Sequence, residues 1–291
     1  MKNIEKHDFK IFDAHMHSYG IFLNHGEDVI SYMDRFNVEK AIVTTINKGV
    51  SLKKLTKDDE AQNPEKNESG SISKVWETFK YAMPKGQLSH QDVIDLAKKA
   101  PERIYKFFWF NPKLKSEEEE ENYKVLENHF KLGFRGVKIH SAFHLVRVPK
   151  DILKLASFMQ DYDKKFVLFI HSLPKTIFFG GISAQDIAKL ADQFPSLRII
   201  VGHAAYCMEY SLEVAMTLRK YKNIYFETSC SVSYGIFNLI KSMGHERILF
   251  GSDSPVASQL PIEIEKIQTL PISEEQKRDI LYNNVNGLLL K

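Results

Sequence analysis

The chain has 291 residues, of which 43% are hydrophobic and 26% are charged, a composition typical of a soluble globular protein. Its 40 basic and 37 acidic residues leave a formal net charge of +3, too small to indicate nucleic acid or a membrane surface as a partner. The two cysteines, Cys207 and Cys230, cannot form a disulfide framework, and the N-terminal residues lack the apolar stretch of a signal peptide. We therefore expect a cytoplasmic protein.

Short runs rich in Ile, Val and Phe alternate along the chain with segments of helical periodicity. Near-continuous apolar runs are typical of parallel strands that are covered on both faces. The predicted strands lie at about 9–15, 40–46, 104–110, 136–140, 166–171, 198–203, 223–229 and 247–252. The predicted helices lie at about 28–36, 89–99, 116–132, 151–162, 183–194, 209–221, 234–243 and 273–289.

The spacing of the predicted strands suits one strand–helix unit each, apart from one longer interval after the second strand. Eight such units predict an α/β fold, a single (β/α)8 TIM barrel that occupies residues 1–291 as one domain. A doubly wound open sheet is the alternative, but the chain lacks the glycine-rich dinucleotide fingerprint. The longer interval contains an insertion at 47–87, which is expected either to act as a lid or to cover the barrel's side.

Histidines gather where the predicted strands end. The first strand carries the motif DAHMH, and because strand side chains alternate in direction, His15 and His17 point the same way. His171 ends the fifth strand, His203 ends the sixth, and Asp253 follows the eighth. In a barrel these ends form one rim, and the eighth strand adjoins the first. Burying so many polar groups without partners would be costly, and a metal ion would satisfy them.

The same motifs carry a family resemblance. DAHMH, GFRGVKIH, FIHS, IIVGHAA and LFGSDSP occur in this order, and NVNGLL closes the chain. Together they resemble the amidohydrolase superfamily, and most of all its amidohydrolase-2 branch, which contains decarboxylases, hydratases, lactonases and hydrolases. The resemblance covers nearly the whole chain. It implies metal-dependent chemistry on a TIM barrel without specifying the reaction.

Carried over position by position, the resemblance implies that His15, His17, His171 and Asp253 hold one divalent metal ion. It makes His203 the catalytic histidine, with Asp253 serving both as ligand and as proton shuttle. Three imidazoles and one carboxylate suit Zn2+, although Mn2+, Fe2+ or Co2+ could occupy the same set. Bound zinc can lower the pKa of water to roughly 7, and a histidine with an ordinary pKa of ~6.5 can exchange that proton.

Further polar residues near the predicted rim are candidates for contacting substrate or supporting the ligands. Lys138 and His140 share a face of the fourth strand, and Arg147 follows it. In binuclear members of the superfamily a lysine on this strand is carbamylated and bridges two metals. We expect Lys138 to be ion-paired at the barrel mouth instead, because the branch usually works with one ion. Glu227, near the end of the seventh strand, has no assigned role.

These residues predict a metal-dependent hydrolase that uses a metal-activated water to cleave an amide, lactone or ester bond of a small molecule. The alternative is a lyase, a metal-dependent decarboxylase or hydratase that acts on an unsaturated or aromatic carboxylic acid. The same ligands serve both. A carboxylate-binding arginine would favour the lyase, and Arg147 is the obvious local candidate. Family decarboxylases often take such an arginine from a neighbouring subunit, so the resemblance is also compatible with a homodimer.

Two other classes fit less well. A TatD-type nuclease shares the histidines and the final aspartate, but a metal-binding glutamate expected at the end of the third strand is replaced by the sequence FWFNP. A barrel without enzymatic activity is disfavoured because none of the expected ligands is missing. The expected partner is therefore a small-molecule substrate, with neither nucleic acid nor a membrane involved.

Overall fold

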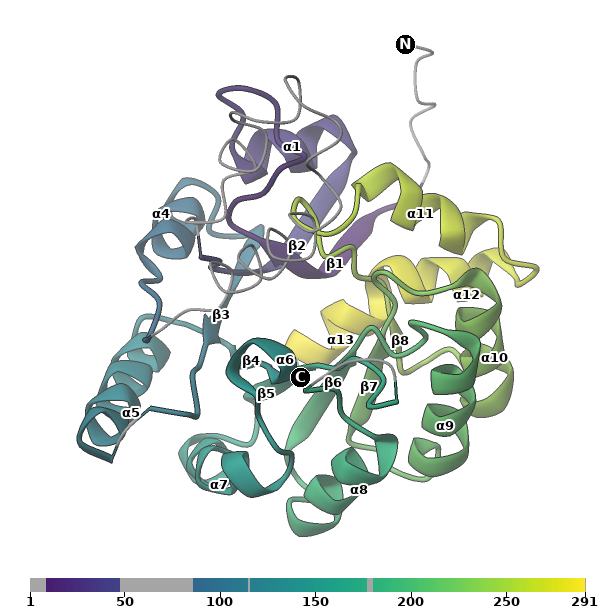
Figure 1. Cartoon of the computed structure of the whole chain (residues 1–291). Helices are drawn as coiled ribbons and strands as arrows, with labels where there is room; N and C mark the ends of the chain where they lie inside the picture. The colour runs from purple at the N-terminus through teal and green to yellow at the C-terminus, as the bar shows by residue number, and fades with distance from the viewer. Residues whose placement is uncertain (1–8, 48–85, 115, 177–179, 291) are drawn as a thin grey trace, which may run out of the picture.

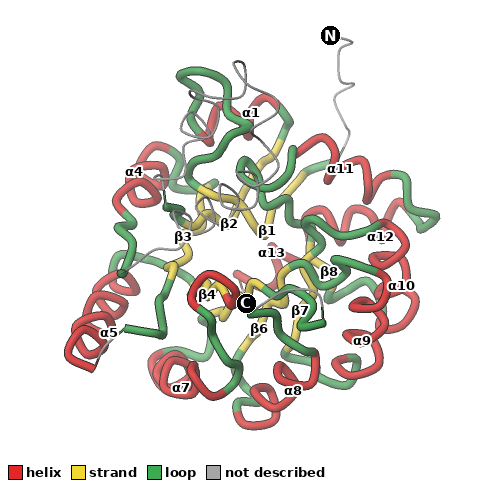
Figure 2. The backbone as a smooth tube through the Cα atoms, in the orientation of Figure 1, coloured by secondary structure: helices red, strands yellow, loops and turns green. Residues whose placement is uncertain are grey.

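The computed structural model describes residues 9–47, 86–114, 116–176 and 180–290. Their eight strands form one parallel sheet in the order β1 to β8, and Figures 1 and 2 show the strands at the centre with helices around them. The strands are β1 Ile11–His17, β2 Val38–Thr44, β3 Ile104–Trp109, β4 Gly136–His140, β5 Val167–His171, β6 Arg198–Gly202, β7 Ile224–Glu227 and β8 Ile248–Leu249.

Helices separate successive strands, as repeated β–α units require. They are α1 Val29–Arg35, α4 Gln91–Lys99, α5 Ser116–Lys131, α6 Ser141–His144, α7 Leu153–Tyr162, α8 Ala184–Gln193, α9 Met208–Leu218, α10 Ser233–Met243, α11 Leu260–Gln268, α12 Glu274–Arg278 and α13 Asn284–Leu290. A 3-10 turn, η2 (Lys150–Ile152), precedes α7, and a π turn, η3 (Asp279–Asn283), joins α12 to α13. None of the helices in the described part of the chain is long and apolar enough to cross a membrane.

The predicted (β/α)8 barrel is confirmed, and the doubly wound alternative is not the observed order. Strand β1 continues two residues beyond the predicted end, so both histidines of its motif lie within the strand. The helix predicted at 273–289 is divided by the π turn, and α6 and α11 had not been predicted. The insertion predicted at 47–87 lies, apart from its two ends, outside the described residues.

Polar side chains at the first turns fix where several helices begin. The Asp28 carboxylate accepts a hydrogen bond from the backbone N–H of Ser31 at 3.0 Å, which caps α1. Ser273 and Gln276 form a reciprocal capping box at the start of α12. Such caps satisfy backbone N–H groups that have no partner within the helix, and each stabilises the helix by about 1 kcal/mol.

The interior of the barrel is apolar below its mouth. A Cβ on Gly136 would collide with the Phe107 ring, and a Cβ on Gly202 with the Phe169 ring, so both glycines leave room for interior aromatic side chains. The α13 helix closes the floor. The interior cluster consists of Phe12, Ala14, Ile42, Phe107, Val167, Phe169, Ile200 and Leu249, together with Val285 and Leu288 from α13.

The first and last strands close the barrel through an irregular junction. One isolated parallel bridge links them instead of a continuous ladder. The backbone N–H of Asp253 donates to the carbonyl of His15 at 2.8 Å. The Asp13 carboxyl accepts from the backbone N–H of Ser252 at 3.1 Å and from its hydroxyl at 2.5 Å. Burial raises the pKa of Asp13 well above its usual value, so this junction holds a buried carboxyl group in a dry environment.

A buried histidine links α4 to the C-terminal end of β3. Its Nε2 accepts a hydrogen bond from the backbone N–H of Trp109 at 2.7 Å, and its ring stacks on Phe108 with 4.1 Å between centroids. This residue is His90, and burial, followed by the nearby His129, lowers its pKa to about 3. The ring is therefore neutral in the folded protein at pH values where it becomes protonated in the unfolded chain.

We expect this mismatch to weaken the fold in mild acid. Because the folded pKa of His90 lies below the unfolded value, the stabilisation is present above about pH 6.5 and is lost as the pH falls. Relative to a His90→Gln variant, whose side-chain oxygen can still accept the Trp109 N–H, the wild type should lose about 2 kcal/mol more between pH 7 and pH 5. Urea unfolding at the two pH values measures this, and an equal loss in both proteins would contradict it.

Candidate metal centre

Five predicted polar side chains meet at the C-terminal mouth of the barrel. His15 and His17 come from β1, His171 ends β5, His203 follows β6 and Asp253 follows β8. All five are buried. One ligand atom from each of His15, His171, His203 and Asp253 lies within 4.8 Å of the others. The strand ends therefore bring together a buried group of three histidines and one aspartate that could hold a metal ion.

His17 lies outside that group of four but contacts the same carboxylate. Its Nε2 is 3.0 Å from Asp253 Oδ1, and His15 Nε2 is 3.2 Å from the same oxygen. His203 Nε2 is farther away, at 3.7 Å from Asp253 Oδ2, and lies 3.0 Å from His171 Nδ1. All five side chains thus form one cluster around the carboxylate.

Two members of the cluster have left-handed backbone conformations. His203 and Asp253 both have φ of 55°, a region that costs a non-glycine residue of order 1–3 kcal/mol. Each is held there by a hydrogen bond. The N–H of His203 donates to Glu227 at 3.1 Å, and that of Asp253 donates to the His15 carbonyl. Backbone strain is thus concentrated at the residues that present side chains to the mouth.

Hydrogen bonds at Nδ1 determine which nitrogen of each β1 histidine faces the cluster. His15 Nδ1 lies 3.3 Å from the Glu227 carboxylate and 3.1 Å from the Ser229 hydroxyl, and His17 Nδ1 lies 3.4 Å from the Thr45 carbonyl. The Ser229 hydroxyl donates its own proton to Glu227, so every one of these oxygens accepts from Nδ1, and Nε2 presents a lone pair. Burial, aided by Lys138, lowers the pKa of both rings, that of His17 to about 3, so neither carries a second proton.

The donor set fits a divalent metal ion. Asp253 contributes a carboxylate to the cluster, and its Oδ1 is the oxygen nearest to both β1 histidines. Two imidazole lone pairs therefore face an anionic oxygen at about hydrogen-bond distance, with no proton between them. A cation relieves this repulsion. Imidazole nitrogens with one carboxylate are ligands that Zn2+ and Mn2+ accept.

Lys138 supplies part of that positive charge. Its side chain is buried, and its Nζ lies 3.0 Å from His17 Nε2 and within hydrogen-bond distance of His15 Nε2. It also lies over the rings of Trp109 and Phe169, at 5.2 and 5.4 Å from their centroids. Burial lowers its pKa to about 8. Lys138 therefore lies at the barrel mouth, as predicted. Its hydrogen-bond partners are two imidazoles, whereas an ion pair with an acidic side chain was expected.

Flat rings form the wall of the cluster on the β3–β4 side. The His140 ring stacks on His171, with centroids 3.7 Å apart and planes 18° apart. On the other side it stacks on Phe143 at 3.8 Å, and Trp109 lies nearly parallel to it at 5.6 Å. His140 thus adjoins the metal-ligand candidates, as its position on β4 predicted.

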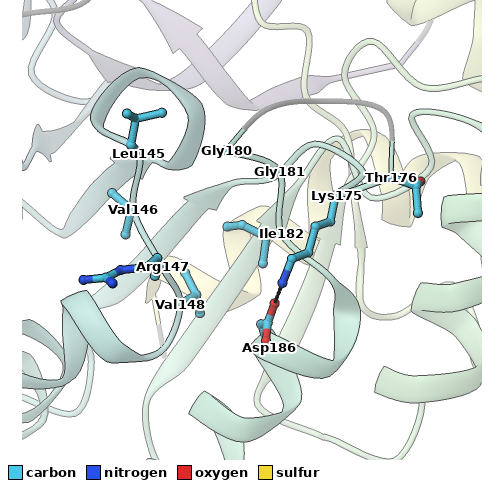
Figure 3. A pocket seen from close by; sticks show the side chains of 10 residues that line it. All are labelled: Leu145, Val146, Arg147, Val148, Lys175, Thr176, Gly180, Gly181, Ile182 and Asp186. Carbon is cyan, nitrogen blue, oxygen red and sulfur yellow. Dashed lines mark hydrogen bonds and ion pairs between the residues drawn. The ribbon is translucent and has the colours of Figure 1, made fainter.

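The structure keeps Arg147 apart from this cluster. Its guanidinium makes two hydrogen bonds to the Asp151 carboxylate, at 2.9 and 3.2 Å. It lines a separate pocket of about 750 Å³ that Figure 3 shows from close by. Lys175 in the same pocket pairs with Asp186 at 3.4 Å. Both cations are therefore already paired within the protein.

Sequence patterns did not assign a role to several residues that hold the cluster. Glu227 is fully buried at the end of β7, and Ser229 two residues later contacts both His15 and His203. Thr45 acts only through its carbonyl toward His17. The position of Glu227 at a strand end was a usable signal, because interior positions at strand ends face the mouth. No comparable sequence signal marked Ser229 or the backbone carbonyl of Thr45.

Comparisons with known proteins identify a family and similar folds. A family model described as amidohydrolase matches residues 12–285. Among the curated proteins no match was found. The fold is similar to 2,6-dihydroxybenzoate decarboxylase from Rhizobium, with a TM-score of 0.61, 16% identity, and coverage of 97% of this chain and 98% of that one.

Two further solved structures are similar. An uncharacterised TIM-barrel protein from Bordetella bronchiseptica has a TM-score of 0.62 and 18% identity, covering 97% of this chain and 98% of that one. A dihydroxybenzoic acid decarboxylase from Polaromonas sp. JS666, with bound manganese and the inhibitor 2-nitroresorcinol, has a TM-score of 0.56 and 18% identity. The match covers 90% of this chain and 84% of that one. At these identities the likeness shows the fold.

We expect removal of one imidazole to abolish stoichiometric metal binding. His171→Asn should weaken binding of a divalent ion by more than about 100-fold, because a ligand lost from the cluster costs more than loss of a supporting contact. Metal content after dialysis, measured by mass spectrometry, tests this. His90→Gln is the matched control, since His90 is buried outside the cluster and should leave metal content unchanged. Full metal content in His171→Asn would refute the site.

Proposed function

The chain belongs to the amidohydrolase family, and on that premise we propose that it is a metal-dependent decarboxylase of an aromatic or unsaturated carboxylic acid. The observation that carries the proposal is the wall of flat rings, Trp109, His140 and Phe143, directly beside the metal-ligand candidates. Parallel rings of this kind stack favourably on a planar substrate. The two named enzymes among the similar structures, decarboxylases of hydroxybenzoic acids, also support this choice over a hydrolase.

For the metal we propose His15, His17, His171 and Asp253 as ligands. The two β1 histidines approach the Asp253 carboxylate more closely than His203 does, which leaves His203 for proton transfer. A bound divalent ion would supply Lewis acidity that orients and polarises an anionic substrate. Zn2+ and Mn2+ both suit this set, and the similar Polaromonas decarboxylase contains manganese.

We propose His203 as the proton donor. Its Nδ1 lies 2.9 Å from the Ser229 carbonyl, so Nδ1 keeps its proton and Nε2 exchanges one. In the reaction the bond between the ring carbon and the carboxylate breaks, and its electron pair takes the proton from Nε2. Carbon dioxide leaves, and the imidazole returns to its neutral form until solvent protonates it again. Asp253, 3.7 Å from Nε2, stabilises the protonated ring.

Lys138 is the proposed partner for the substrate carboxylate. Arg147 is engaged with Asp151, whereas Lys138 is a buried cation at the mouth with only neutral rings as hydrogen-bond partners among the described residues. A charge-assisted hydrogen bond from its ammonium to a carboxylate would satisfy both groups. His140 has both ring faces covered, by His171 and Phe143, and holds these rings in place. The half-buried Phe143 is the proposed surface on which the substrate's planar part rests.

The function is tested with the metal-loaded enzyme and a panel of hydroxybenzoic acids, with 2,6-dihydroxybenzoate among them. We expect release of carbon dioxide with at least one acid. His203→Asn should lower kcat by about 10²- to 10⁴-fold, the usual contribution of a positioned acid or base, and should retain its metal. Esters, lactones and amides run in parallel decide between the reactions. Their cleavage without any decarboxylation would establish the hydrolase instead.

The role of Lys138 predicts a separate effect on substrate binding. Lys138→Met keeps the length of the side chain but removes its charge, and it should raise KM by about tenfold or more, because hydrogen bonds between charged groups contribute roughly 1.5–3 kcal/mol. Arg147→Met provides the comparison for an exposed cation and should change KM less than about twofold. Steady-state kinetics with metal content verified measures both. An unchanged KM in Lys138→Met rules out carboxylate binding by this residue.

A further inference from the structure

Glu227 is a fully buried carboxylate that contacts two histidines of the cluster. Glu227 ends β7 with no exposed surface. It accepts hydrogen bonds from the backbone N–H of Ser229 at 2.5 Å and its hydroxyl at 2.9 Å. It also accepts from the N–H of His203 at 3.1 Å, and His15 Nδ1 lies 3.3 Å from the same carboxylate.

Packing alone does not account for this side chain. An ionised carboxylate in a barrel interior costs several kcal/mol unless its oxygens are fully hydrogen-bonded. The neighbouring strand leaves space for it, because a Cβ on Gly251 would collide with the carboxyl group of Glu227. An apolar side chain would fill the same volume without that cost. The contacts that distinguish Glu227 from such a filler are those to Ser229, His15 and His203, and the last two residues belong to the cluster.

We infer that Glu227 is a positioning residue that fixes His15 in the tautomer with the proton on Nδ1, so that the Nε2 lone pair faces the metal site. The carboxylate only accepts, and the Ser229 hydroxyl, 3.1 Å from the same Nδ1, donates its own proton to Glu227, so the His15 nitrogen that faces both must donate. The same carboxylate holds the left-handed backbone of His203 through its N–H. Carboxylates behind metal-binding histidines act in this way in many metal sites.

A second buried carboxyl group provides a matched comparison on the opposite side of His15. Asp13 is also fully buried, but it accepts only from the backbone N–H of His15 and from the backbone and hydroxyl of Ser252. It contacts no imidazole nitrogen among the described residues. Asp13 therefore holds the junction of β1 with β8, whereas Glu227 controls the orientation and the tautomer of the ring.

The test is Glu227→Gln in the full chain, with two readouts. In metal-free protein, ¹⁵N NMR of the imidazoles reports the tautomer of His15, and the wild type should show the proton on Nδ1. The variant should lose that preference, since the anionic acceptor is gone. Affinity for Zn2+ and for Mn2+, measured by competition with a chelator, should fall about 10- to 100-fold. Neither readout depends on the reaction that the enzyme catalyses.

Two further variants separate positioning from general loss of structure. Asp13→Asn should lower the free energy of unfolding but keep the His15 tautomer and leave metal affinity within about twofold. Gly251→Ala displaces the Glu227 carboxylate without removing its charge, and should shift the tautomer in the same direction as Glu227→Gln. Gly251→Ala also tests the inference if the Glu227→Gln variant fails to fold. The inference is overturned if Glu227→Gln keeps the wild-type tautomer and affinity, or if Asp13→Asn loses as much affinity.

Discussion

The meeting of the first strand with the last is the constraint on which the site depends. A closed barrel requires this contact, and here it is made by few hydrogen bonds rather than a full ladder. Asp13 holds Ser252, and the backbone of Asp253 bonds to His15. The backbone bond from Asp253 to His15 therefore also places the aspartate against the β1 histidines, whereas Asp13 fixes the neighbouring Ser252.

Burial gives the cluster its chemical character. Because the mouth is buried, the rings of His15 and His17 are neutral, and the neighbouring acceptors determine which nitrogen of each ring carries its single proton. Glu227 holds that proton at Nδ1 of His15, and Thr45 holds it at Nδ1 of His17, on the side away from the cluster. The result is a set of lone pairs already oriented toward one point. Such preorganisation is what metal binding and electrostatic catalysis require.

The strands and the ligand candidates were predictable because each leaves a pattern in the sequence. The strands appear as apolar runs at regular spacing, and the ligand candidates appear as polar residues where those runs end. The short α6, of four residues, has too few residues for a periodic signal. The pairing of Arg147 with Asp151, four residues on, depends on local backbone geometry that the sequence pattern does not predict. The tautomers depend on carbonyls such as that of Thr45, which side-chain patterns do not record. Hydrolase and decarboxylase share one ligand set, so only the walls of the site separate them.

The barrel floor has a consequence for how the chain folds. The last helix, α13, closes the interior beneath Phe12 of β1, and the junction residues Asp13 and Ser252 lie 239 positions apart in the sequence. Contacts this distant form late, because the chain must first lose the entropy of closing a long loop. A ribosome-bound intermediate that lacks β8 and α13 can form strand–helix pairs but neither a floor nor a complete metal site. Metal ions would therefore meet the full ligand set only after these two elements have been synthesised.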